Sequence, residues 1–187
     1  MPVKRYNGTA WEVIAGDGVV GAPGTPGTNG TNGIDAGMTL LSTTTLSGTS
    51  TAITGISQAY NHLFVTIENA AHSTTGVYWN FDIDGLSFRT FQNSVHGTTK
   101  YETQASGTPS IAQDEAGGIY GYVWIYNYAS ASRIRHYALN TRYTTSEGSA
   151  ARWATGTTTS TTAIDAITID ANGSTMSGGT IRVYGVK

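Results

Sequence analysis

Glycine recurs at every third position along one short segment of this chain. Six consecutive triplets run from Gly18 to Asp35 and read GVV GAP GTP GTN GTN GID. A collagen triple helix winds three extended chains so closely that only glycine fits at the axis, once in every three residues. A single chain gains nothing from this spacing, so the pattern predicts that three identical chains assemble. The predicted axial residues are Gly18, Gly21, Gly24, Gly27, Gly30 and Gly33.

The predicted stem is short and weak by collagen standards. At about 3 Å per residue, residues 18–35 would form a rod roughly 50 Å long. Of the twelve positions that follow a glycine in the six triplets, only two hold proline, Pro23 and Pro26. The repeat breaks at Ala36, where the next glycine is due. We therefore expect the flanking parts of the chain to hold three chains together. The alternative is a flexible Gly-Thr-Asn linker without a triple helix.

The segment before the stem, residues 1–17, carries a hairpin signal. Asn7-Gly8 stands between alternating flanks, which is a strong local indication of a β-hairpin. A two-stranded hairpin is at best marginally stable by itself. It must therefore pack against its copies in a trimer or against a larger assembly. The expected paired arms carry Val3 and Arg5 on one strand and Trp11 and Val13 on the other.

Residues 38–187 predict an all-β head domain. Runs rich in β-branched and aromatic residues recur between Gly, Asn, Asp and Ser, a pattern typical of a jelly-roll-like β-sandwich. The apolar alternation slips by one position between Ile164 and Ile167, which predicts a β-bulge. The predicted protein is thus a trimer with an N-terminal hairpin (1–17), a collagen-like stem (18–37) and this head. The expected strands are 63–67, 78–83, 120–126, 133–139, 164–169 and 181–186.

Charged residues are sparse, and this narrows the choice of partners. They make up 12% of the chain, and the net charge is -2. Nucleic-acid binding requires a basic stripe that neutralises phosphates, so no nucleic-acid partner is expected. Neither membrane insertion nor a secretory signal is expected, because the apolar runs are too short. The chain has no cysteine, which excludes disulfides and thiolate metal sites.

Several short motifs of the head occur in a recognisable order. They are Tyr60-Asn61-His62-Leu63, Phe81-Asp82-Ile83-Asp84-Gly85, Ile125-Tyr126-Asn127-Tyr128-Ala129, Ile167-Thr168-Ile169 and Gly179-Thr180-Ile181-Arg182-Val183-Tyr184-Gly185-Val186. Together they resemble a widespread family of small bacteriophage structural proteins, in which an "aYkHL" strand, an "rFNGD" hairpin, an "I.DYAnt.k" strand and turn, and a C-terminal "i.LYGi" strand recur. The chain departs from that pattern at Asp82-Ile83-Asp84-Gly85, where the family more often has Asn-Gly.

The resemblance implies a trimeric fibre protein on the virion surface, assembled in the host cytoplasm and released by lysis. The hairpin is then expected to attach to other virion proteins through Tyr6, Trp11 and Val13. The head is expected to adhere to a host envelope component, either a glycan or a protein, without a cofactor. Two alternatives remain: a head fibre or decoration protein fixed to the capsid shell, and a glycan-active enzyme. Complement-type and tumour-necrosis-factor-like proteins share the arrangement of stalk and head only.

One predicted strand carries an unusual number of aromatic residues. Tyr120, Tyr122, Trp124, Tyr126 and Tyr128 alternate with smaller residues and are therefore expected on one face. Such a face is expected to pack, as core or trimer interface, where Tyr and Trp are enriched. The alternative is a platform on which the rings stack against sugars.

A second group of candidate contact residues lies further along the chain. Arg142, Tyr143, Arg152 and Trp153 stand in polar sequence that reads as loops. Exposed loop arginines and aromatics commonly serve binding. The sequence therefore predicts host contacts here, with a plain surface role as the alternative.

Catalytic and metal-binding motifs are weak. Asp82 and Asp84 of the D-x-D-G motif could hold calcium, but an Asp-Gly turn explains them more simply. Asp114 and Glu115 are adjacent, and adjacent residues of an extended chain point in opposite directions. No pair of His62, His72, His96 and His136 has the spacing of a zinc site, and no nucleophile elbow is present. We therefore expect no enzyme and no metal.

Overall fold

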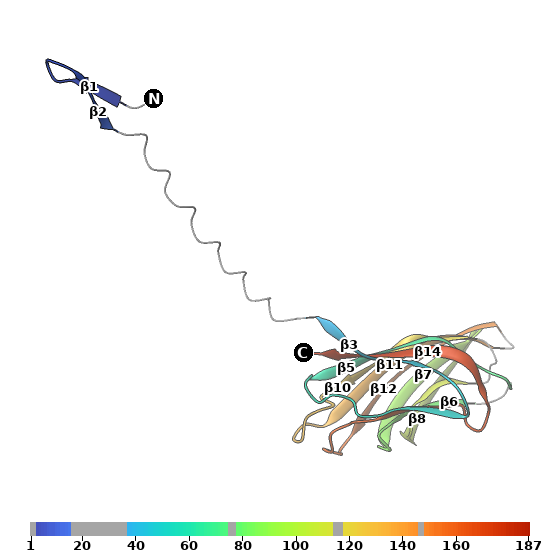
Figure 1. The fold of residues 1–187 in the computed structure, drawn as a ribbon. Helices are drawn as coiled ribbons and strands as arrows, with labels where there is room; N and C mark the ends of the chain where they lie inside the picture. The colour runs from blue at the N-terminus through green and yellow to red at the C-terminus, as the bar shows by residue number, and fades with distance from the viewer. Residues whose placement is uncertain (1–2, 16–36, 75–77, 114–117, 146–147) are drawn as a thin grey trace. The chain divides into compact units, whose positions relative to one another are not determined.

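The computed structural model describes residues 3–15, 37–74, 78–113, 118–145 and 148–187 (Figure 1). The chain divides into two units, Met1–Ile34 and Asp35–Lys187, and each is described by itself. Within the described residues every regular element is a β-strand. The prediction of an all-β protein is thus confirmed. The predicted triple-helical stem, with all six of its glycines, lies outside the described residues.

The first unit contains the predicted N-terminal hairpin. Strands β1 (Val3–Tyr6) and β2 (Trp11–Ala15) pair antiparallel, with Tyr6 opposite Trp11. The loop spans four residues, and the Asn7 side-chain oxygen accepts hydrogen bonds from the backbone N–H groups of Thr9 (3.0 Å) and Ala10 (2.8 Å). The arms pair differently from the expectation, because Val13 lies opposite Lys4. The asparagine therefore holds the loop through its side chain rather than through a two-residue turn.

The second unit is built from two antiparallel sheets. The larger has eight strands in the order β3-β14-β5-β10-β11-β12-β7-β8, and the smaller has four in the order β4-β13-β6-β9. The strands of the large sheet are β3 (Met38–Thr45), β14 (Met176–Val186), β5 (His62–His72), β10 (Ile119–Tyr126), β11 (Arg135–Thr145), β12 (Gly148–Thr158), β7 (Phe88–His96) and β8 (Thr99–Gly107). Those of the small sheet are β4 (Ser50–Ile53), β13 (Ile167–Asp170), β6 (Tyr78–Ile83) and β9 (Ser110–Gln113).

The chain passes repeatedly from one sheet to the other. β3, β5, β9 and β13 are each followed by a strand of the opposite sheet. As a result, each strand in the order β4-β13-β6-β9 is next in the chain to the strand at the same place in the order β3-β14-β5-β10, which forms one end of the large sheet. Two hairpins, β7–β8 and β11–β12, extend the large sheet by four further strands. The large sheet is therefore wider than the small one.

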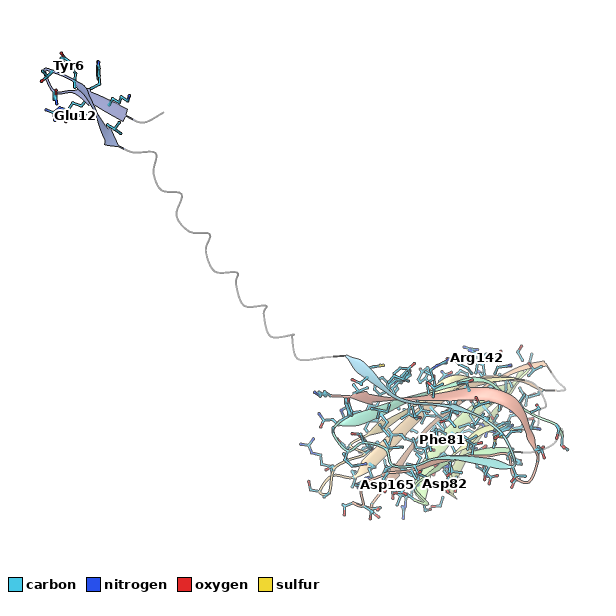
Figure 2. All side chains as sticks on the ribbon, viewed as in Figure 1. Tyr6, Glu12, Phe81, Asp82, Arg142 and Asp165 are labelled. Atoms are coloured by element: carbon cyan, nitrogen blue, oxygen red, sulfur yellow. The ribbon has the colours of Figure 1, made fainter. Side chains whose placement is uncertain are left out.

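A single hydrophobic core joins the two sheets. From the large sheet it takes alternate residues such as Leu63 and Val65, and from the small sheet Phe81, which lies among the strands in Figure 2. Strand alternation sends every second side chain to the same face, and those facing the other sheet are fully buried. Burial of such side chains contributes about 1.5–3 kcal/mol each relative to an exposed position. The sandwich is thus held by the facing residues of both sheets.

The strand predictions succeed where apolar residues alternate. β5, β6, β10, β11, β13 and β14 overlap the six predicted runs. The bulge predicted within 164–169 is wrong, because β13 begins only at Ile167. Ile164 lies in the connection before it, where it is buried and donates its N–H to the Tyr128 carbonyl (3.0 Å). Six strands that are rich in small and polar residues escaped prediction, namely β3, β4, β7, β8, β9 and β12.

The D-x-D-G motif forms a tight turn. Asp84 and Gly85 both have positive φ, 53° and 66°, and Leu86 donates its N–H to the Ile83 carbonyl (3.0 Å). Asp82 supports the turn by accepting the Gly85 N–H (2.8 Å). The predicted turn is confirmed, but it is not a hairpin, since β6 belongs to the small sheet and β7 to the large one. The turn carries the chain between the layers.

Candidate functional site

The outer face of the large sheet carries the aromatic side chains of β10. Val123 and Ile125 point into the core and are fully buried, so the alternate residues point outward. Tyr120 is 53% exposed and Tyr122 41%. Of the two expected kinds of packing, the core is wrong for these rings, because the aliphatic side of β10 faces the small sheet. Packing at a trimer interface stays a prediction. The outward rings are surface that a single chain leaves open.

Tyr128 does not belong to that face. β10 ends at Tyr126, and Asn127 has a positive φ of 58°. This turn sends Tyr128 inward, where it is fully buried and donates its hydroxyl hydrogen to the Ser57 carbonyl. Burial raises the pKa of the Tyr128 phenol. Of the five rings expected on one face, the outer face therefore carries four: Tyr120, Tyr122, Trp124 and Tyr126.

Neighbouring strands continue the aromatic surface. Strand pairing aligns Leu40 of β3, Tyr184 of β14, Phe64 of β5 and Trp124 of β10 in one line across the sheet, which we call the aromatic row. The Phe64 ring lies 4.8 Å from that of Trp124 and 6.2 Å from that of Tyr184, between centroids. Tyr126 stacks on Trp124 at 5.9 Å with an interplanar angle of 11°. These contacts hold the row as a continuous apolar surface.

A hollow follows the aromatic row on the same face, and we call it the aromatic trough. Its walls are Tyr122 of β10 and, further along the sheet, Phe91 of β7 and Trp153 of β12. The floor is low because Ala138 and Thr155 are small. The trough has a volume of about 240 Å³ and is lined by Phe91, Asn93, Tyr122, Ala138, Leu139, Asn140, Trp153, Ala154 and Thr155.

The trough opens into a second hollow of about 410 Å³ that shares Phe91, Ala138 and Thr155 with it. Arg89, Tyr126 and His136 line this extension. β10 and β7 are three strand spacings apart, or about 14 Å. Aromatic walls, small floor residues and polar amides form a concave surface of the kind that binds small ligands through stacking and hydrogen bonds.

The predicted contact residues Arg142, Tyr143, Arg152 and Trp153 lie on strands β11 and β12, not on loops. Alternation along each strand separates them. Arg142 and Trp153 point outward, with Trp153 40% exposed, and Arg142 lies at the surface of the head in Figure 2. Tyr143 and Arg152 point inward and are buried. The loop prediction is wrong for all four, and two of them are inaccessible to a host ligand.

Arg152 and Tyr143 belong to the interior instead. Arg152 is 1% exposed and donates a hydrogen bond from its guanidinium to the Ser110 hydroxyl. Burial lowers the pKa of Arg152, which the neighbouring Tyr143 partly offsets. Burial likewise raises the pKa of Tyr143, whose hydroxyl lies 3.2 Å from His96 Nε2. These residues fasten β11 and β12 to neighbouring strands.

The hairpin residues share one surface. Tyr6 and Trp11 are paired across the strands, their ring centroids lie 5.4 Å apart, and Val13 follows Trp11 by two positions. All three are more than half exposed. Because alternate residues of a strand point to the same side, they form a small apolar face. The attachment of this face to other virion proteins stays a prediction.

Another hollow lies where two of the motif segments, 60–63 and 125–129, meet. It has a volume of about 570 Å³ and is lined by Gln58, Ala59, Tyr60, Asn61, His62, Asn127, Ala129, Ser130 and Arg133. The His62 ring accepts the Asn127 N–H at Nδ1 (3.2 Å) and so holds the turn after β10. Among the described residues that line this hollow there is no carboxylate.

The remaining sequence candidates are distributed as follows. Among the described residues no group of three His, Asp or Glu side chains could hold a metal ion. Asp82 is engaged in its turn, and His72 is buried against the Trp79 ring at 5.3 Å. Asp114 and Glu115 lie outside the described residues.

The fold and this outer face define an antiparallel all-β protein with a broad aromatic surface. Comparison of the chain with protein-family models, curated proteins and solved structures finds no match. In the described parts of the chain, no helix has the length and apolarity that a membrane span requires.

Proposed function

We propose that this chain is a trimeric fibre protein on the surface of a bacteriophage particle, associated with the tail. The hairpin attaches it to other virion proteins, the collagen-like stem projects it, and the head adheres to a host envelope component. The observation that carries the proposal is the run of six glycine triplets between an exposed apolar hairpin and an all-β head.

The topology of the head supports a jelly roll. A jelly roll sets two sheets of four antiparallel strands face to face through two Greek keys. The orders β3-β14-β5-β10 and β4-β13-β6-β9 correspond to this pattern, with the two hairpins as additions. Jelly rolls are common in viral capsid and lectin domains. This agrees with a role in a particle and in binding.

The first and the last motif segments meet through one contact. Gly185 of the last motif lies so close to Tyr60 of the first motif that an added Cβ would overlap the tyrosine ring. The aromatic residue near the start of the head thus covers the glycine of the C-terminal strand. Two motifs that are distant in sequence therefore depend on each other in space.

The aromatic trough supports adhesion to a glycan. Tyr122 and Trp153 offer rings for the apolar faces of sugars, and Asn140 and Asn93 offer amides for hydroxyl groups. Such sites are individually weak. Three linked heads raise the apparent affinity through effective concentration, without any new contact.

Two measurements test the assembly. Sedimentation of the purified full chain should give a trimer, and a monomer would remove the proposal. Gly27→Ala should lower the first melting step, because three added methyl groups crowd the axis. An unchanged profile would indicate a plain linker. Labelling of particles with antibody then distinguishes the tail from the capsid shell, where the protein would serve as a decoration.

Adhesion is tested on host envelope polysaccharide with the full chain. Trp153→Ala should weaken binding at least tenfold. Tyr101→Ala is the matched control, because Tyr101 is comparably exposed, at 47% against 40% for Trp153, but does not line the trough. Equal binding by both variants would refute the site. Release of oligosaccharides during the incubation would instead indicate an enzyme.

A further inference from the structure

We propose that the aromatic row is the surface through which the three heads of one fibre pack against each other. The surface consists of the row itself, Leu40, Tyr184, Phe64 and Trp124, together with Met38, which precedes Leu40 by two positions on β3. The partner at this surface is a second copy of the same chain. The inference rests on the proposed three-chain stem and adds to it the face that each head turns toward the axis.

If the proposed stem forms, chain connectivity keeps the start of β3 close to the axis of the stem. The last glycine triplet ends at Asp35, and β3 begins at Met38. Three residues span at most about 11 Å. In a triple helix the three chains wind around one axis, so the three copies of Met38 must start near that axis. Met38 and Leu40 are about half exposed, at 49% and 51%, and these apolar side chains thus gather where other copies are closest.

The position of β3 in the sheet favours the same arrangement. β3 is the first strand of the large sheet, with β14 as its neighbour on one side. An edge strand presents backbone N–H and C=O groups that tend to pair with another chain unless something covers them. A neighbouring head seated on the row would cover this edge. An apolar face and an open edge therefore coincide at the point where the stem enters the head.

The surface itself has the character of a protein interface. The row spans four strands, a width of about 14 Å. Its rings hold each other at centroid distances of 4.8 and 6.2 Å, so little side-chain entropy is lost on association. Interface centres are enriched in aromatic residues and Met and depleted in charge. Arg182, two positions before Tyr184 on β14, forms an ion pair with Glu68.

The contrast with the trough separates the two surfaces. The trough is hollow and carries polar amides on its lining, which suits a small ligand. Rings of the row instead pack against one another, which suits a broad partner. The row is continuous with β3, whereas the far wall of the trough is formed by β7 and β12. The outer face of the large sheet thus carries the assembly surface on β3, β14, β5 and β10, and the ligand surface between β10 and β7.

The absence of cysteine from the chain makes single-cysteine variants specific probes. Leu40→Cys of the full chain is the test variant, and Gln104→Cys of β8 is its control, because Gln104 is exposed and occupies the same line of the same face at the opposite edge. A short bis-maleimide should link Leu40→Cys chains into pairs, with one chain in three left over. The Gln104→Cys protein should remain unlinked under the same conditions.

A second pair of variants does not depend on linker geometry. Tyr184→Ser should weaken the trimer. In moderate urea, the protein concentration below which trimers dissociate should rise at least tenfold, as expected for loss of an aromatic side chain at an interface centre. Trp153→Ser, at the trough, should leave that concentration unchanged. Far-ultraviolet circular dichroism establishes that both variants are folded.

The outcomes separate this inference from the proposed function. If the wild-type chain sediments as a monomer, the proposed function fails and the inference fails with it. If the wild type is a trimer but Leu40→Cys and Gln104→Cys are linked equally, the inference alone is overturned. The same holds if Tyr184→Ser dissociates like Trp153→Ser.

Discussion

Tyr137 makes the stability of this protein depend on pH in the alkaline range. Its ring is 1% exposed, and its hydroxyl donates a hydrogen bond to the Thr90 hydroxyl (2.8 Å). The ring meets Phe88 edge-on at a centroid distance of 5.2 Å. Burial raises the pKa of Tyr137 from 10.0 to about 12, although the Thr90 hydrogen bond and the Arg152 charge oppose the increase. The folded protein therefore holds this proton more tightly than the unfolded chain.

The magnitude follows from the two pKa values. Each pKa unit corresponds to about 1.36 kcal/mol, so a rise from 10.0 to about 12 amounts to about 2–3 kcal/mol of folding free energy. The sign is that of a raised pKa. The contribution is fully present below pH 10, where both states are protonated, and it is lost as the pH rises to about 12.

The assay is urea unfolding of the full chain between pH 9 and pH 12. Tyr137→Phe should lose about 2–3 kcal/mol less than the wild type over this range. At pH 9 the free energy of unfolding of Tyr137→Phe should be about 1 kcal/mol below that of the wild type, because the hydrogen bond to Thr90 is gone. Tyr137→Phe should still lose some unfolding free energy between pH 9 and pH 12, since burial also raises the pKa values of Tyr128 and Tyr143.

Tyr101→Phe is the control, because it removes an exposed phenol, and it should follow the wild type. The reasoning is refuted if Tyr137→Phe and the wild type lose the same free energy between pH 9 and pH 12. In that case the phenol ionises in the folded state as readily as in the unfolded chain.

Three substitutions test other close contacts. In Gly156→Ala the added methyl group would overlap the Tyr137 ring, so the free energy of unfolding should fall by about 1–3 kcal/mol. The same substitution should cost less in a Tyr137→Leu background. If the two substitutions had strictly additive effects on the free energy of unfolding, this would contradict the contact. Gly185→Ala crowds the Tyr60 ring and should cost about 1–2 kcal/mol; a melting temperature equal to that of the wild type would argue against it. Asp82→Ala removes the acceptor of the Gly85 N–H and should cost about 1 kcal/mol in thermal unfolding; no change would show that the turn does not need the side chain.

Local patterns predicted the strands whose buried residues are large. β5 and β14 were foreseen because Leu63, Val65, Ile181 and Val183 are apolar and alternate. β12 was missed because its inward positions are Ala150, Arg152 and Ala154. β8 was missed because nearly all of its residues are exposed, so no apolar alternation marks it. A strand at the end of a widened sheet has less core to face and leaves a weaker signal.

The candidate site was foreseen in part. The sequence indicated the aromatic alternation of β10 and the exposure of Trp153. It gave no sign that β10 and β12 form the two sides of one trough, because this depends on strand pairing through β11. Phe91 escaped notice for the same reason. Its place in the wall follows from the pairing of β7 with β12.

Two features can be read from the order of residues alone: the glycine spacing, from which we predict three chains, and the alternation that separates Val123 and Ile125 from Tyr122 and Trp124. Both depend on local backbone geometry. Which face of β10 becomes core was undetermined, since both faces are apolar. The small sheet decided it by covering the aliphatic side. Its position results from pairings between residues far apart in the chain, such as Ile83 with Ile167, and no local pattern encodes them.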